Sequence, residues 1–275
     1  MDLPGETLTT ENPSFRQLLM VLCGIWAALH FNVLFGKQVL PWDAIDQFYP
    51  TVYFNAHTLR SGLVPWWNPY IYAGYPQIGD PQGMMFSPLL MGWMLLRQDP
   101  GAVWFDWGVL LHVLMGGAAM LALLRRYGGN ALGWLLGATV FMAGGVAASR
   151  LEHTPDVIAY AYVPVVLLAL RQFLDEPRGR RGLILGVAAG AMVTQLVQIT
   201  YLFVLVIVVH AAIGTVRRWA AYDLRRRRGW YAGVAVALAM ASAIGLPQLL
   251  VGWQPPVLRY RGGMPLLSSP SPWWP

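Results

Sequence analysis

Residues 182–216 read GLILGVAAGAMVTQLVQITYLFVLVIVVHAAIGTV, a run of 35 residues without one charged side chain. A single helix of this length would be about 52 Å long, whereas the hydrocarbon core of a bilayer is about 30 Å thick. The run therefore predicts two membrane-spanning helices, with a turn near Gln195, Gln198 and Thr200. This hairpin alone indicates a polytopic membrane protein.

Five further apolar runs accompany this hairpin. They occupy residues 17–36, 107–124, 127–149, 157–170 and 231–250. The shortest of them, 157–170, lies between Asp156 and Arg171, so it crosses a bilayer only if its helix extends past these charges. The sequence therefore predicts an all-α integral membrane protein. We expect a single domain over residues 1–275, built as a bundle of about seven transmembrane helices.

The composition and the distribution of charge agree with this class. The chain is 56% hydrophobic and 12% charged, whereas a soluble domain is about a quarter charged. The net charge of +6 does not indicate nucleic-acid binding, because Lys and Arg occur in short clusters between apolar runs. With seven spans, 13 of the 19 basic residues fall on the side of the N-terminus. The positive-inside rule makes that side cytoplasmic.

Two segments on the opposite, outer side carry a variety of acid and base side chains. The first, residues 37–86, contains PWDAIDQFYP at 41–50 and continues through PWWNPYIYAGYPQIGDPQGMMFSP at 65–88. Its Trp and Tyr residues favour short helices lying along the membrane surface. The second segment is short and holds Arg150, Glu152, His153 and Asp156. Ionisable groups between helices at a membrane surface are candidates for function.

The residues of the first segment carry a resemblance to a known family. They are Asp43, Gln47, Phe48, Tyr49, Pro50, Gly62, Pro65, Trp67, Asn68, Pro69, Gly74, Pro76, Asp80 and Pro81. This set resembles the first outer loop of the bacterial YfhO-like membrane proteins, which belong to the GT-C glycosyltransferases. Arg150, His153, Tyr162 and Pro164 resemble that family's second outer loop, and residues 195–201 resemble its later helical hairpin. Members of the family usually continue through further spans, so the chain is similar to their N-terminal part or to a short relative.

The resemblance implies a membrane glycosyltransferase of the bacterial inner membrane. Such an enzyme moves a sugar from a polyprenyl-phosphate donor to an envelope glycan or lipid on the outer face. The family's key carboxylate follows the first span, and Asp43 occupies that place. A carboxylate there would take the proton of the acceptor hydroxyl. Asp46 and Asp80 are candidates for a second carboxylate or a ligand of a divalent cation such as Mg²⁺ or Mn²⁺.

Three cations are candidates for binding the donor phosphate, whose negative charge grows as the bond to the sugar breaks. They are Arg150, His153 and Arg60. Each candidate also has a structural interpretation. Asp43 and Asp46 could cap a helix, Asp80 could form a turn, His153 could be a hydrated surface side chain, and Arg150 could anchor a helix end.

Two other functions compete with the enzyme. One is an envelope lipid or glycan transporter or flippase, and the other is a non-catalytic membrane subunit. A transporter usually shows charged or broken helices at mid-membrane and internal repeats, whereas the acids of this chain cluster in its outer segments. The sequence favours the enzyme and leaves open the sugar, the acceptor and the use of a metal.

Overall fold

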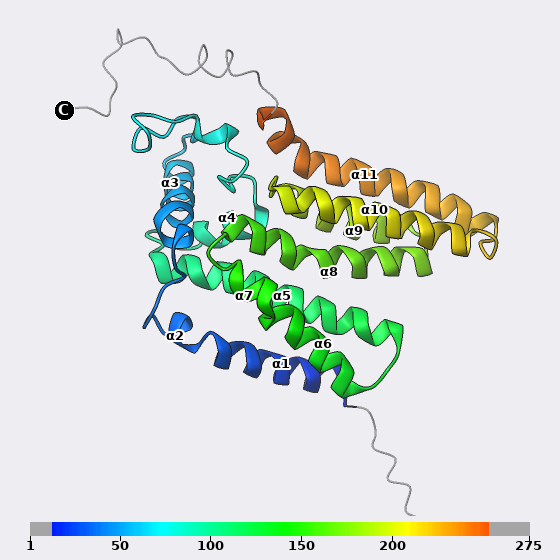
Figure 1. Cartoon of the computed structure of the whole chain (residues 1–275). Helices are drawn as coiled ribbons and strands as arrows, with labels where there is room; N and C mark the ends of the chain where they lie inside the picture. The colour runs from blue at the N-terminus through cyan, green and yellow to red at the C-terminus, as the bar shows by residue number, and fades with distance from the viewer. Residues whose placement is uncertain (1–12, 253–275) are drawn as a thin grey trace, which may run out of the picture.

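The structure is a computed structural model, and it describes residues 13–252. Within this range the chain forms helices and turns, and no β-strand is present among these residues. Figure 1 shows long helices packed side by side, with shorter elements gathered at one end. The elements in order are α1 Phe15–Leu29, α2 Phe31–Leu34, η1 Ala44–Phe48, α3 Tyr49–Arg60, η2 Gln77–Gly79, α4 Pro88–Leu95, α5 Ala102–Tyr127, α6 Ala131–Ala143, α7 Gly145–Ser149, α8 Thr154–Asp175, α9 Gly179–Val193, α10 Gln198–Trp219 and α11 Leu224–Gly252.

Five helical segments of the described residues are long and apolar enough to cross a membrane. They are α5, α6 continued by α7, α8, α10 and α11. An all-helical, multi-pass membrane protein is therefore confirmed as the class of this chain. Two further helices, α1 and α9, have 15 residues each. At 1.5 Å per residue they are about 22 Å long, which is less than the thickness of the bilayer core.

The break predicted inside the long uncharged run is confirmed. Helix α9 ends at Val193 and α10 begins at Gln198. The hydroxyl of Thr194 donates to the carbonyl of Ala191 at 2.7 Å, and the hydroxyl of Thr200 donates to the carbonyl of Gln195. The polar residues of the turn thus satisfy backbone carbonyls that the interrupted helices leave unpaired, which an apolar environment requires.

The first predicted span differs from the structure. The sequence predicted one helix over residues 17–36, but the chain breaks at His30 and resumes as the single turn α2. The indole of Trp107 on α5 donates to the carbonyl of Leu34 at 3.0 Å, so a tertiary bond satisfies the end of α2. A pattern of apolar residues contains no sign of such a bond.

Two other spans have shifted bounds. The span predicted at 127–149 starts only at Ala131, because Gly128 and Gly129 have φ angles of 90° and 102° and end α5. The short run at 157–170 lengthens into α8, which includes both Asp156 and Arg171. This extension past the charges is what the sequence required for the run to span a bilayer.

The core lies between α1, α5 and α8. The indole of Trp26 on α1 donates to the carbonyl of Leu110 on α5 at 3.0 Å, and the guanidinium of Arg125 lies 5.5 Å from the ring of Phe15. The two helices are therefore antiparallel. Buried apolar side chains such as Leu22, Leu110 and Ile158 fill the space between the three helices.

Helices α9 and α11 meet along a seam of small residues. A Cβ atom on Gly182 would collide with the carbonyl oxygen of Gly233, and one on Gly186 would collide with that of Ala237. Because the paired residue numbers rise together, α9 and α11 are parallel. Small residues at such a seam allow two backbones to approach closely.

One end of the bundle is held together by arginines, and we call it the arginine end. Asp175, the last residue of α8, lies 3.4 Å from Arg126 of α5 and 3.3 Å from Arg218 of α10. Its own helix supplies Arg171 at 3.2 Å. The C-termini of α5, α8 and α10 thus meet at one carboxylate, so these three helices run in the same direction.

The opposite end, which we call the loop end, is covered by residues 37–101. Helix α3 crosses this end of the bundle instead of running along it (Figure 1). The buried carboxylate of Asp106 on α5 accepts a hydrogen bond from the N–H of Leu40 at 3.1 Å. The amide of Gln248 on α11 donates to the carbonyl of Asp80 at 3.4 Å. These two bonds attach the segment to the ends of two bundle helices.

Candidate functional site

The backbone around Asp43 has an unusual conformation. Trp42 has a φ angle of 54°, which lies in the left-handed region that an aromatic residue rarely adopts. Residues Ala44–Phe48 then form one turn of π-helix, and such turns occur frequently at functional sites. The N–H groups of Ile45 and Asp46 both donate to the carbonyl of Trp42 at 3.0 Å. Because the backbone already satisfies these donors, the carboxylate of Asp43 is not needed as a cap.

The carboxylate of Asp43 faces a histidine from a distant part of the chain. Asp43 stands at the N-cap position of η1, but its side chain makes no capping hydrogen bond there. Its Oδ2 lies 3.7 Å from Nε2 of His153, which precedes α8. The two side chains are 48% and 35% exposed, so both remain accessible from outside. The ring of Phe48, with its centroid 5.9 Å from that of His153, flanks the pair.

Arg150 lies in the same turn as His153. It ends α7, and the N–H of His153 donates to its carbonyl at 2.9 Å. The guanidinium of Arg150 is half exposed and lies 3.9 Å from the carboxylate of Asp156 in the first turn of α8. At that separation the ion pair is loose, so the guanidinium can turn towards a bound anion. The structure thus brings Asp43 next to His153, and Arg150 lies in the same turn as His153 and pairs with Asp156.

Asp46 lies one turn after Asp43 and faces a different space. It lines a pocket of about 710 Å³ between α3 and the segment that follows it. Tyr49, Tyr53 and His57 form the α3 wall of this pocket, and Tyr70 and Tyr72 contribute to the opposite wall. The hydroxyl of Tyr53 donates to the carboxylate of Asp99 at 3.0 Å, and this bond raises the pKa of Tyr53.

Asp80 forms a turn. Its Oδ1 accepts a hydrogen bond from the N–H of Gln82 at 2.8 Å, and its carbonyl accepts the amide of Gln248. Burial raises the pKa of the Asp80 carboxyl, and the bond from Gln82 partly opposes this rise. These contacts correspond to the turn interpretation of Asp80.

Arg60 does not lie near Asp43. It ends α3, at the opposite end of the continuous η1–α3 helical segment from Asp43. Its guanidinium donates to the carbonyl of Met94 at 3.3 Å and to the carbonyl of Leu95, both at the C-terminus of α4. Arg60 therefore satisfies the end of a neighbouring helix.

Metal binding has little support from the side chains at the loop end. Among residues 13–252, no group of three His, Cys, Asp or Glu side chains could hold a metal ion. Asp43 and Asp46 thus lack a third ligand of these types within the described range. These side chains alone do not form a complete metal site, and we derive no step through a divalent cation.

Several polar residues beneath the loop end were missed by the sequence interpretation. Asn55, Gln77, Ser87 and Gln248 are each at most 1% exposed. The amide of Asn55 donates to the carbonyl of Gly83 at 2.8 Å, so these residues hold the segment that covers the bundle. The sequence holds no local signal for them, because their burial depends on how the covering segment packs on the bundle.

The loop end thus holds an accessible Asp43–His153 pair and, next to it along the chain, a loose Arg150–Asp156 pair. A scan against protein-family models, a search among curated proteins and a search among solved structures each found no match to this chain.

Proposed function

We propose that this chain is a glycosyltransferase that moves a sugar from a polyprenyl-phosphate donor to a hydroxyl of an envelope glycan or lipid. The observation that carries the proposal is the proximity of Asp43 and His153. They are 110 positions apart in the sequence, yet their side chains lie 3.7 Å apart at the loop end. Groups from separate loops converge in this way when they act on one reaction centre.

Asp43, His153 and Arg150 have different roles in the proposed reaction. Asp43 accepts the proton of the acceptor hydroxyl, while the hydroxyl oxygen forms a bond to the anomeric carbon of the donor sugar. The bond between that carbon and the phosphate oxygen breaks, and the polyprenyl phosphate leaves as an anion. The space of 3.7 Å between Asp43 and His153 does not admit a carbon centre. His153 therefore orients the carboxylate, and Arg150 is the cation for the leaving phosphate.

The pocket beside Asp46 supplies room for the acceptor. Its volume of about 710 Å³ lies within the usual range for small-molecule sites. Tyr49, Tyr53 and His57 repeat at four-residue intervals, so they form one continuous wall along α3. Aromatic rings and a carboxylate suit the apolar faces and the hydroxyl groups of a sugar. The wall begins at Tyr49, six residues after Asp43, and the acceptor hydroxyl extends from this pocket towards the base.

The proposal includes seven crossings of a bacterial inner membrane. The arginine end lies in the cytoplasm and the loop end outside, with α1, α5, α6–α7, α8, α9, α10 and α11 as the spans. The arginines in the last turn of α5, around the α8–α9 turn and around the α10–α11 turn all support this orientation. Helices α1 and α9 are short for a flat bilayer, and local thinning or snorkelling of flanking side chains accommodates them.

Replacement of the base tests the proposal. We expect Asp43→Asn to fold normally, because the amide is nearly isosteric, and to lose about 10²-fold or more of its transfer rate. The assay measures transfer of radiolabelled glucose or mannose from a polyprenyl-phosphate carrier in membranes that contain the full chain. Glu152→Gln is the matched control, since it removes a carboxylate of the segment that carries His153 and should leave transfer unchanged. Full transfer by Asp43→Asn would refute the mechanism.

A further inference from the structure

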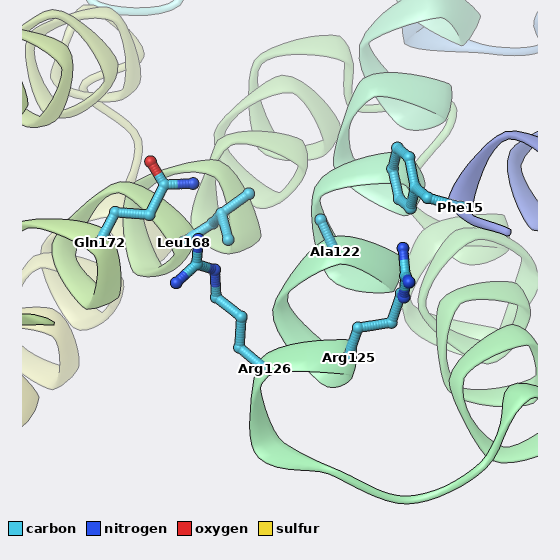
Figure 2. Close-up of a pocket in the computed structure, with 6 residues that line it drawn as sticks. All are labelled: Phe15, Ala122, Arg125, Arg126, Leu168 and Gln172. Carbon is cyan, nitrogen blue, oxygen red and sulfur yellow. The ribbon is translucent and has the colours of Figure 1, made fainter. Parts of the chain in front are cut away.

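A second hollow lies at the arginine end, far from Asp43. It has a volume of about 460 Å³ and lies between α1, α5 and α8. Figure 2 shows its lining: Arg125 turns towards Phe15 of α1, Arg126 turns towards Leu168 of α8, and Ala122 lies between them. Two guanidinium groups therefore border a small hollow with an apolar base.

The charge of this hollow is only partly compensated. Arg126 shares the carboxylate of Asp175 with Arg171 and Arg218. Arg125 lies 5.5 Å from the ring centroids of Phe15 and Trp134, and no carboxylate of residues 13–252 pairs with it. Each guanidinium carries five N–H donors, so most donors of both arginines remain for a ligand.

The surroundings specify the class of that ligand. The planar fork of an arginine matches the oxygens of a phosphate, and two such side chains border this hollow. Phe15, Ala122 and Leu168 present apolar surface next to the cations, which suits the glycerol esters and upper acyl chains of a lipid. The hollow also lies at the end of the spanning helices α5 and α8, where the phosphates of one leaflet are located.

We propose that this hollow, formed by Arg125, Arg126, Gln172 and their apolar neighbours, is a binding site for the phosphate group of an anionic phospholipid. The amide of Gln172 adds a neutral donor opposite the arginines. The lipid then bridges α1, α5 and α8 and neutralises the positive charge that these helices concentrate at one end. This site is independent of the chemistry at the loop end.

The test measures lipid binding by the full-length chain in neutral detergent. Phosphatidylglycerol is titrated while thermal unfolding and lipid adducts in native mass spectrometry are followed, with phosphatidylcholine as the neutral reference. We expect phosphatidylglycerol to raise the unfolding midpoint more than phosphatidylcholine does. Arg125→Gln should weaken this binding about fivefold, and Arg125→Gln with Arg126→Gln about thirtyfold. The single variant keeps the Arg126–Asp175 pair, so it reports binding even where the double variant is unstable.

The control removes the same charge elsewhere at the same end. Arg225 and Arg228 are exposed at the start of α11, so Arg225→Gln with Arg228→Gln should retain the binding of phosphatidylglycerol. An equal loss in this control would show that only the total charge acts, and the proposed site would be wrong. An equal stabilisation by inorganic phosphate would mean that the hollow takes a free anion, which would refute the lipid as its ligand.

Discussion

The two ends of the helical bundle use charge in opposite ways. At the arginine end, a single carboxylate, Asp175, pairs with three arginines at 3.2–3.4 Å. At the loop end, Asp43 lies 3.7 Å from His153 and Arg150 lies 3.9 Å from Asp156. Three of these four side chains are more than a third exposed, and Asp156 is 21% exposed. The first arrangement binds three helix ends together. The second leaves its charged groups able to change partners.

This difference indicates which end stabilises the packing of the helices and which end has charged groups available to a substrate. The carboxylate of Asp175 already contacts three guanidinium groups, so it is engaged in joining helix ends. A carboxylate with one loose partner on a strained turn remains available to a substrate. The comparison of the two ends therefore supports a reaction centre at the loop end, and three experiments test it.

The first experiment has an all-or-none outcome, because the two ends should face opposite sides of the membrane. Tyr72→Cys and Leu224→Cys are made in a Cys23→Ser background; Tyr72 is 87% exposed at the loop end and Leu224 is 67% exposed at the arginine end. A membrane-impermeant maleimide should label position 72 in intact cells and position 224 only after permeabilisation. Labelling of both positions in intact cells would contradict the orientation.

The second experiment compares a glycine that contacts a neighbouring helix with a glycine that has free space around it. Gly182→Leu at the arginine end forces a side chain into the backbone of Gly233 and should destabilise the fold by about 3 kcal/mol or more. Gly92→Leu in α4 at the loop end is the matched control, since no atom lies within 4 Å of an added Cβ there. The measurement is unfolding by denaturant in detergent micelles. Equal effects of both variants would show that the seam is not closely packed.

The third experiment has the smallest expected effect and concerns the ion pairs. Asp175→Asn leaves three arginines without their common carboxylate and should cost about 1–2 kcal/mol of stability at low salt. Asp156→Asn at the loop end removes one pair of 3.9 Å and should cost less than about 0.5 kcal/mol. Both are read from unfolding midpoints, and salt should reduce the difference because it screens exposed charges. A larger loss of stability from Asp156→Asn than from Asp175→Asn would show that the ion pair at the loop end stabilises the fold more than those at the arginine end.

Much of the bundle could be predicted because its signals are local. The length of an apolar run decides whether a helix crosses, and the polar residues at 194–200 predicted the break between α9 and α10. The break at His30 could not be predicted in this way. Residues 17–36 form one uncharged run without a mark at His30, and the bond that satisfies the end of α2 comes from Trp107, which lies 73 residues from Leu34.

The amino-acid sequence was enough to predict the class of the protein, most of its long helices and the candidate residues of its two polar segments. Which of these candidates meet depends on the folded chain: Asp43 lies beside His153, Asp46 lines an aromatic pocket, and Arg60 binds the end of α4. The two kinds of feature differ in the range of the interactions behind them. Hydropathy acts over one helix, whereas the meeting of distant side chains depends on how whole helices and a long covering segment pack against one another.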